Sequence, residues 1–455
     1  MRKVLKYPNY KESDVEWLGS IPEHWKIVKA KRILREVSIK NHPDEPLLAA
    51  TQTKGVIPKS LYENTTVTAS KNFETLKLVR KGDFVISLRS FQGGIEYAHY
   101  QGIISPAYTI LEPQEEVIHN YYRYLLKSKR YISGLTLLVT GIREGQNIDT
   151  SKFKDSFLPL PPKEEQTAIA HFLDYKLAKI NRFIQKKKQL IKLLNEQKAA
   201  IINQAVTKGL DPNAKVKDSG VEWLGEIPEH WAVRKLKYSV KLNSHTSFEN
   251  QESENAKIAL ENIESKTGRI LELSQNAFEG IGTIFKKGDV LFGKLRPYLA
   301  KVATPIFEGN CVNEILVFTP DNRIWNHEFL KYRILAADFI SLVDNSTYGA
   351  KMPRASWSFI GALKLSSPPL IEQTKIIEHI EEQHSDTNLL IAKIEKEIAL
   401  SEEYKTALIA EAVTGKMDVR GYEVPEISEE ETYEEIEEEI SMAAEDGEEY
   451  QTIEE

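Results

Sequence analysis

The chain has 455 residues, of which 41% are hydrophobic and 28% are charged, as is typical of a soluble globular protein with several domains. It contains no apolar run long enough to cross a membrane, and its first residues lack the apolar core of a signal peptide. Its single cysteine, Cys311, excludes an internal disulfide framework and a cysteine-cluster zinc site, so we expect a cytoplasmic protein.

The net charge of −7 hides two regions of opposite sign. The segment 421–455 holds 16 of the 67 acidic residues and no Lys or Arg, which leaves 51 acidic and 60 basic residues, or +9, in the rest. A mildly basic body is compatible with nucleic acid but does not establish it. We expect the acidic tail, 419–455, to be disordered or weakly helical and to keep the protein soluble. The alternative is an acidic arm that competes with DNA for a basic groove.

The first recognisable element is the string VEWLGSIPEHW at residues 15–25, which returns with one substitution as VEWLGEIPEHW at residues 221–231. We predict that the two tryptophans of each copy are packing anchors, because paired aromatic side chains mostly fix the geometry of an element. His24 and His230 are predicted to be structural, since companion metal ligands are not evident near them.

A variable stretch, 26–161, follows the first string. It contains short β-type runs such as DFVISLR and AYTILEP, with helix-like pieces between them. The motif LPPKEEQ then opens a helical pattern of about 44 residues, because proline and glutamate favour a helix N-terminus. Gly209 and Pro212 are predicted to end this helix.

The second string is followed by the same series of parts: a variable stretch, 232–368, the motif SPPLIEQ, and a second long helical pattern within 369–418. Further matching pairs, such as RKGDFV with KKGDVL and AVTKGLD with AVTGKMD, are separated by 206 or 207 residues. The chain is therefore a tandem duplication. Between these anchors the two variable stretches barely match, which suggests one scaffold with two different specificities.

Hydrophobic residues recur with a spacing of three or four along both long helices, as in a coiled coil. A single helix of roughly 65 Å cannot bury such a stripe alone, so the simplest arrangement pairs the two helices antiparallel. Lys198 and Lys405 occupy equivalent positions in this seam, either snorkelling at its edge or fixing its register. The predicted fold is mixed α/β (α+β), with two variable domains joined by two antiparallel coiled-coil helices in a pseudo-twofold duplication.

The W-L-G-x-I-P-E-H-W strings, the duplication and the P-P-x-x-E-Q helices together resemble the specificity subunits of type I restriction–modification systems, over nearly the whole chain. The resemblance implies that 26–161 and 232–368 are target-recognition domains, each reading one half of an asymmetric bipartite site in double-stranded DNA. The N-terminal segment 1–25, the central helix and junction 162–231 and the distal helix 369–418 would form the conserved frame. That frame would recruit two methyltransferase (modification) subunits and the restriction (motor–nuclease) subunits. The twin strings would be equivalent junctions between helices and recognition domains.

Sequence motifs for chemistry are absent. There is no phosphate-binding G-x-x-x-x-G-K-[ST], no G-x-G-x-x-G and no Asn/Asp-Pro-Pro-aromatic motif that would hold a flipped adenine. We therefore expect a non-catalytic subunit without a cofactor or metal of its own, whose partners supply S-adenosylmethionine, ATP and Mg²⁺. Two alternatives remain open: a coiled-coil protein scaffold with two protein-binding domains, and an enzyme with an unrecognised active site.

Base readout needs forked donors such as Arg, Asn and Gln, whereas backbone anchoring needs Lys, Arg and hydroxyl groups. Two loop-like clusters in each variable stretch offer such groups. The candidates in the first stretch are Arg89, Ser90, Gln92, Arg143, Gln146 and Asn147. The candidates in the second stretch are Lys294, Arg296, Tyr298, Tyr348, Lys351 and Arg354. The alternative is that each cluster is a solvated surface loop.

Overall fold

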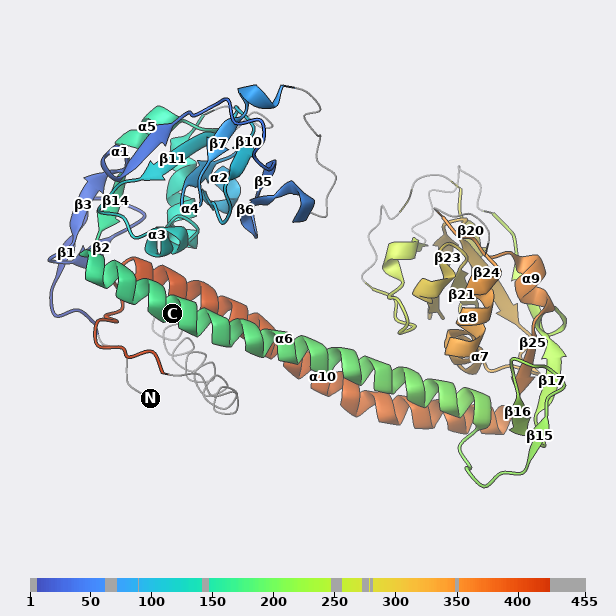
Figure 1. Ribbon diagram of the computed structural model, residues 1–455. Coiled ribbons are helices and arrows are strands. Elements are labelled where there is room, and N and C mark those ends of the chain that lie inside the picture. Colours follow the sequence, from blue (N-terminus) through green and yellow to red (C-terminus); the bar gives the residue numbers. More distant parts are fainter. Residues whose placement is uncertain are drawn as a thin grey trace. The chain divides into compact units, whose positions relative to one another are not determined.

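The computed structural model divides the chain into two compact units (Figure 1). Unit 1 comprises residues 1–187 and 396–455, and unit 2 comprises residues 188–395. The structure describes residues 6–61, 72–88, 90–140, 147–246, 256–271, 278, 281–347 and 352–425. Across these ranges, none of the helices combines the length and the apolar character that a membrane span needs.

The part of unit 1 before its long helix is built from short strands and helices. In chain order these are β1 (Tyr10–Glu12), β2 (Ser20–Pro22), β3 (Lys26–Lys29), α1 (Ala30–Ile33), β4 (Leu34–Val37), β5 (Leu48–Thr51), β6 (Gly55–Pro58), η1 (Lys59–Leu61), η2 (Phe73–Thr75), β7 (Lys77–Val79), β8 (Phe84–Ile86), α2 (Ser90–Gly93), β9 (Glu96–Tyr97), β10 (Gly102–Ile104), β11 (Thr109–Pro113), α3 (His119–Leu125), α4 (Lys129–Leu135), η3 (Thr136–Leu138), β12 (Val139–Thr140), β13 (Asn147–Ile148), α5 (Thr150–Asp155) and β14 (Phe157–Leu160). The long helix α6 (Lys163–Lys208) follows.

Over its described residues, unit 2 repeats this plan. In chain order these are β15 (Val216–Asp218), β16 (Glu226–Pro228), β17 (Ala232–Lys235), η5 (Leu236–Tyr238), β18 (Val240–Asn243), β19 (Ala256–Ile258), η6 (Leu260–Asn262), β20 (Thr283–Phe285), β21 (Val290–Gly293), η7 (Pro297–Leu299), β22 (Val302–Ala303), β23 (Gly309–Cys311), β24 (Ile315–Pro320), α7 (His327–Leu335), α8 (Ala337–Asn345), α9 (Trp357–Ala362) and β25 (Lys364–Ser367). The long helix α10 (Leu370–Val413) follows.

Each unit is organised around a four-stranded antiparallel sheet with the same topology, β4-β11-β8-β9 in unit 1 and β18-β24-β21-β22 in unit 2. The central strands β8 and β21 are buried on both faces. In β21, Val290 and Phe292 belong to one hydrophobic cluster and Leu291 to another. Because both faces of these strands are buried, consecutive residues have to be apolar. The strands therefore lack the alternation of apolar and polar residues that marks a half-exposed strand.

The frame around each sheet is also duplicated. The hairpin β1–β2 corresponds to β15–β16, and the pair β3–β14 corresponds to β17–β25. At the periphery the units differ, because unit 2 has a sheet β19-β23-β20 with one parallel pair, whereas unit 1 has the separate pairs β5–β6 and β7–β10. The duplication predicted from the sequence is confirmed, and the divergence lies outside the shared frame.

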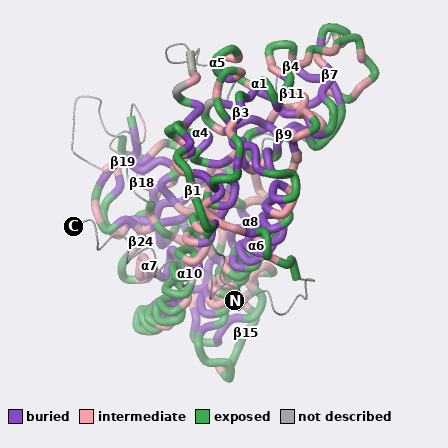
Figure 2. Tube along the Cα trace, turned by 90° about the vertical axis from the view of Figure 1, so that its left-hand side faces the viewer, coloured by how far each residue is buried: buried purple, intermediate pink, exposed green. Residues whose placement is uncertain are grey.

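The two long helices run antiparallel where they pack within each unit (Figure 1). In unit 1 the first half of α6 packs against the last turns of α10; the buried residues of this seam are Leu173, Leu177, Ile180, Phe183, Ile184, Leu408, Ala412 and Val413. In unit 2 the last turns of α6 pack against the first turns of α10; the buried residues are Ile202, Ala205, Val206, Ile376, Ile377 and Ile380. Buried and exposed residues alternate along both helices (Figure 2). The predicted fold class is confirmed.

Polar contacts cross the helix seam at equivalent positions of the two units. Lys198 Nζ donates to Asn388 Oδ1 over 2.6 Å in unit 2, and Lys405 Nζ donates to Asn181 Oδ1 over 2.9 Å in unit 1. Since 181 and 388 differ by 207, as do 198 and 405, the two contacts join equivalent residues of the duplication. A repeated Lys–Asn contact favours a role in helix register over snorkelling alone.

The repeated strings meet the start of each long helix at a glutamate carboxylate, which is buried in unit 1 and partly buried in unit 2. In unit 1, His24 Nε2 lies 2.6 Å from Oε1 of Glu165, and Trp25 Nε1 donates to Oε2 over 2.9 Å. In unit 2, His230 Nε2 and Trp231 Nε1 contact the two oxygens of Glu372 at 2.6 and 3.0 Å. The histidines and these two tryptophans thus have structural contacts, in line with their predicted roles.

The glutamine after each of these glutamates ties the helix to the recognition part of its unit. Gln166 accepts from the Ile118 N–H over 2.8 Å and donates to the carbonyls of Glu116 and Pro161. Gln373 makes the same three bonds with its own unit, accepting from Asn326 and donating to Ile324 and Pro368. The Glu-Gln pair of each P-P-x-x-E-Q motif therefore fixes one end of a long helix to one variable domain.

The region assigned to the acidic tail begins later than predicted. Val419 is 1% exposed within the core of unit 1, and the Tyr422 ring lies edge-on to Phe172 with centroids 4.8 Å apart. Because apolar burial holds these residues, the expectation of disorder from residue 419 is wrong for 419–422. Residues 426–455 lie outside the described part of the chain.

We predict that Glu165→Ala lowers the free energy of unfolding of unit 1 by about 2–4 kcal/mol, because it leaves several buried donors without their acceptor. The matched control is Glu164→Ala, which removes the same charge from an exposed neighbour in the same helical turn and is expected to cost less than about 1 kcal/mol. Urea unfolding followed by circular dichroism measures both. Equal losses for the two variants would contradict the structural role of the Glu165 carboxylate.

Candidate DNA interface

The first candidate loop of unit 1 lies between β8 and β9 and contains the short helix α2. Ser90 is fully buried, and its hydroxyl accepts from the Ser87 N–H over 2.8 Å. The observed role of the Ser90 oxygen is therefore to organise the loop, and its predicted contact with DNA has no exposed group to support it. Gln92 is exposed and keeps its place as a candidate. Arg89 lies outside the described residues.

This loop is packed closely against its own domain. Gly94 has φ +79°, and a Cβ atom there would lie 2.4 Å from the Leu126 carbonyl oxygen. Only glycine fits such an approach, so the Gly93–Gly94 pair of the sequence has a local structural reason. The exposed Gln92 is thus presented from a loop whose backbone path is constrained on one side.

The second candidate loop of unit 1 connects β12 and β13. Arg143 and Gln146 lie outside the described residues, and Asn147 opens β13, with its backbone paired to Thr140. The backbones of α2 and β13 are in contact. The fold therefore brings together the two loops that the sequence singled out separately.

Unit 2 brings its two candidate loops together in another way. The Arg296 N–H donates to the Pro353 carbonyl over 2.8 Å, and the Ala355 N–H donates to the Lys294 carbonyl over 2.9 Å. These bonds flank a β-bridge between Leu295 and Arg354. The segments that were predicted to carry Lys294–Tyr298 and Arg354 are hence neighbours.

The candidate side chains of unit 2 differ in exposure. Arg296 is exposed at a left-handed backbone position, φ +52°, and Tyr298 is 46% exposed. Lys294 is half-buried. Tyr348 and Lys351 lie outside the described residues. Arg296 and Tyr298 are therefore the candidates of unit 2 that the structure presents to solvent.

Arg354 has a partner within its own unit. Its Nε and Nη2 atoms lie 3.2 and 3.1 Å from the two carboxylate oxygens of Glu314, and the Lys294 N–H donates to the Glu314 carbonyl. To bind a base edge, the Arg354 guanidinium would have to release this forked contact. Its observed role is to hold the two loops of unit 2 together.

A buried ion pair lies behind the first loop of unit 1 and was not foreseen from the sequence. Lys127 Nζ lies 2.7 Å from the carboxylate of Glu96 and donates to the carbonyls of Gly93 and Gln52 over 2.7 and 2.9 Å. Glu96 is 1% exposed, and this burial raises its pKa to about 7, although Lys127 acts in the opposite direction. No sequence signal marks Lys127, because its three partners come from distant parts of the chain.

Comparison with known proteins finds a family model that matches the first copy of this frame. Residues 18–193 match the model of the type I restriction modification DNA specificity domain. The chain is thus similar to the type I restriction–modification specificity subunits, and its residues 18–193 match such a specificity domain. The matched range covers the recognition part of unit 1 and the first part of α6, and unit 2 repeats the same frame.

Two curated relatives match this chain over most of its length and over most of their own. The chain is 25% identical to the type I restriction enzyme MjaVIII specificity subunit of Methanocaldococcus jannaschii, across 90% of this chain and 97% of the relative. It is 21% identical to the EcoDI specificity subunit of Escherichia coli, across 88% and 90%. A solved chain from work on the assembly and conformational transition of a type I restriction–modification system shares the fold, with a TM-score of 0.60 and 13% identity over 86% of this chain and 98% of that chain.

The specificity subunit is the non-catalytic member of such an enzyme, which confirms the expectation that this chain is not itself a methyltransferase or nuclease. The individual DNA contacts stay predictions. Of the twelve candidates, Gln92, Arg296 and Tyr298 have side chains that the structure places at the surface.

We predict that unit 1 loses stability as the pH rises from about 4.5 to about 7 through the titration of Glu96. Folding raises the pKa of this carboxyl from 4.5 to about 7 and so favours its protonated form. The stability that comes from the protonated carboxyl is complete below the pKa of the unfolded state. It disappears as the pH rises through the pKa of the folded state. Glu96→Gln should therefore gain stability relative to the unmodified chain by about 1–3 kcal/mol between these pH values.

Urea unfolding at about pH 4.5 and about pH 8 measures this difference. Glu16→Gln, an exposed site in the same unit, is the control and should show no such change. An unchanged stability difference between Glu96→Gln and the unmodified chain at the two pH values would contradict the titration.

Proposed function

We propose that each unit reads one half of an asymmetric bipartite site in double-stranded DNA, and that the paired helices join the two readers and recruit the methyltransferase subunits. The observation that carries this proposal is the pair of equivalent loops on one repeated frame. The loop after β8 presents Gln92, and the loop after β21 presents Arg296 and Tyr298. Loops with the same side chains would favour a symmetric DNA target, whereas loops with different side chains favour two half-sites of different sequence.

The exposed side chains are suited to different bases. Glutamine makes paired hydrogen bonds with adenine, and arginine makes them with guanine in the major groove. Tyr298 adds a hydroxyl group that can contact a phosphate. These pairings predict distinct chemistry for the two half-sites without fixing their full sequences.

Recruitment of partner subunits is supported by the surface of the long helices. Leu193 of α6 is 60% exposed, and Leu389 of α10 is 70% exposed. Large apolar side chains that remain on a helix surface favour protein docking. We propose that the methyltransferase subunits bind there, that restriction subunits join the same complex, and that these partners supply S-adenosylmethionine, ATP and Mg²⁺.

We predict that Arg296→Ala, in the complex with the methyltransferase subunits, weakens binding to the cognate duplex by about 10- to 100-fold, the loss expected for one forked base contact. The loss should vanish when the half-site read by unit 2 is scrambled and persist when the other half is scrambled. Arg323→Ala removes the same charge from an exposed arginine of unit 2 that pairs with Asp321, and it serves as the control. Fluorescence anisotropy with duplexes of defined sequence measures these affinities.

The cognate site itself comes from sequencing methylated bases in cells with and without the gene. Loss of one split methylation motif on deletion is the expected result. Equal affinity of the assembled complex for all duplexes would contradict sequence recognition and favour the scaffold hypothesis. The salt dependence of binding distinguishes phosphate contacts from base contacts, because binding to phosphates weakens steeply with added salt.

A further inference from the structure

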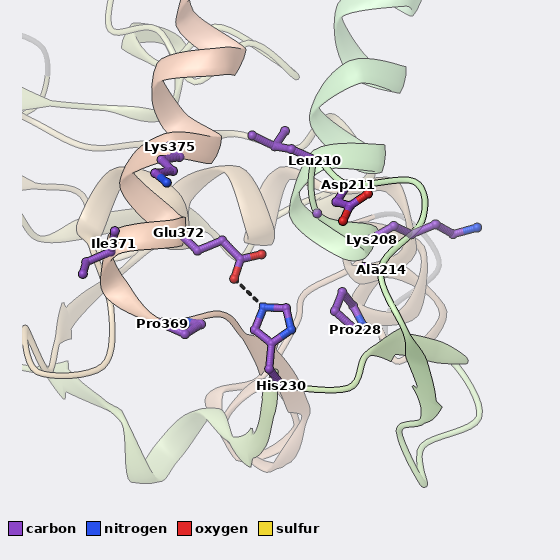
Figure 3. A pocket seen from close by; sticks show the side chains of 11 residues that line it. Lys208, Leu210, Asp211, Ala214, Pro228, His230, Pro369, Ile371, Glu372 and Lys375 are labelled. Atoms are coloured by element: carbon purple, nitrogen blue, oxygen red, sulfur yellow. Dashed lines mark hydrogen bonds and ion pairs between the residues drawn. The ribbon is translucent and has the colours of Figure 1, made fainter.

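A hollow of about 420 Å³ opens at the junction of unit 2, between the end of α6, the second repeated string and the start of α10 (Figure 3). Glu372 and His230 point toward each other at its floor. Asp211 and Ala214 form one side, and Lys208 and Lys375 also line it. The site lies away from the loops proposed to read DNA, since none of those loop residues lines it.

The equivalent place in unit 1 is filled by Tyr7. Its hydroxyl donates to Glu165 Oε2 over 3.0 Å, and its ring centroid lies 5.6 Å from that of His24. The Arg420 guanidinium carbon lies 4.8 Å from the centroid of the Tyr7 ring, and Tyr7 is 3% exposed. Burial and the Glu165 carboxylate raise the pKa of Tyr7 far above its ordinary value, so the phenol stays a donor.

The two sites can be aligned through a shared backbone bond. The Glu23 N–H donates to the Asn9 carbonyl in unit 1, and the Glu229 N–H donates to the Lys215 carbonyl in unit 2. Counting back two residues from each acceptor pairs Tyr7 with Asn213. Asn213 is exposed, and its N–H donates to Asp211 over 2.9 Å. No aromatic side chain of the described residues of unit 2 therefore takes the place of Tyr7.

The difference follows from the path of the chain. In unit 1 two separate segments, 6–9 and 414–422, meet at the junction, and each contributes a side chain to the Tyr7 site. In unit 2 one continuous segment, 209–215, has to leave α6 and enter β15. Gly209 makes the turn at φ +77°, and a Cβ atom there would lie 3.4 Å from Glu372 Oε1. This short connection leaves the carboxylate of Glu372 more exposed than that of Glu165, at 27% against 8%.

We propose that the hollow of unit 2 is a docking pocket for a tyrosine side chain of a partner protein, held by Glu372 as Glu165 holds Tyr7. The phenol hydroxyl would donate to the carboxylate, and its ring would lie against His230. Of the other charged side chains on the lining, Glu372 would hold the phenol and Asp211 accepts from the Asn213 N–H, so Lys208 and Lys375 favour a tyrosine with acidic neighbours. This interaction surface is additional to the DNA-reading function and does not depend on it.

The pocket is tested in the full-length chain labelled with 5-fluorotryptophan, with the fluorine signals of Trp231 and Trp25 assigned through Trp→Phe variants. The probes are the blocked tripeptides Glu-Tyr-Glu, Glu-Phe-Glu and Lys-Tyr-Lys. We expect Glu-Tyr-Glu to shift the Trp231 signal saturably and leave the Trp25 signal unchanged, since Tyr7 already fills the site of Trp25. It should bind at least threefold more tightly than either other peptide.

Asn213→Tyr should abolish the shift by filling the pocket from within, whereas the control Asn213→Ala should leave it unchanged. A Trp231 signal that does not respond, or equal binding of the Tyr and Phe peptides, would overturn the proposal. Tighter binding by Lys-Tyr-Lys would overturn the assignment of an acidic partner. The chain itself carries tyrosines among acidic residues at 433 and 450. If Tyr433→Ala with Tyr450→Ala strengthens peptide binding, the occupant is this segment, and the assignment to a partner protein is wrong.

Discussion

The structure depends on one hydrogen-bonded carboxylate at the start of each long helix, buried in unit 1 and partly buried in unit 2. Glu165 and Glu372 each receive the histidine and tryptophan of a repeated string. A carboxylate in such a place is stable only when its oxygens are supplied with donors. The string, the helix start and the end of the opposite helix are therefore forced to meet, and this constraint explains why the eleven-residue string occurs twice with a single substitution.

The contacts around each carboxylate also join the long helices to the variable domains. Gln166 and Gln373, the next residues in the two helices, bond to the backbone of the variable domains. At the other side, Gly415 approaches Trp25 and Gly209 approaches Trp231, which brings the end of one helix to the start of the other. Recognition loops can then change, as Gln92 and Arg296 illustrate, while the frame that presents them stays the same.

Much of the fold could be predicted from the sequence because the signals were local or repeated. Helical periodicity over more than forty residues and the glycine after Lys208 gave α6 its correct type and end, and the duplication gave α10 by analogy. The antiparallel seam followed from the need to bury two apolar stripes. The Glu–His–Trp contacts could not be foreseen, because they join residues about 140 positions apart and depend on tertiary packing.

The candidate interface was predicted less well, since exposure is decided by tertiary structure. Ser90 has the chemistry of a DNA contact but is buried as a loop organiser, and Arg354 has a forked partner in Glu314. Lys127, which supports the first loop, belongs to a helical region without any motif. The sequence located the loops correctly as pairs on one frame, but it could not distinguish outward-facing donors from those that build the loops.

The central claim is that the tryptophan of the repeated string and the glutamate of the helix start act together. A double-mutant cycle with Trp25→Phe and Glu165→Gln, measured by urea unfolding of the full chain, tests it most directly. We predict that the double variant is more stable than the sum of the single losses implies, by about 1 kcal/mol or more, as for groups in direct contact. Additive losses, within about 0.3 kcal/mol, would contradict the account.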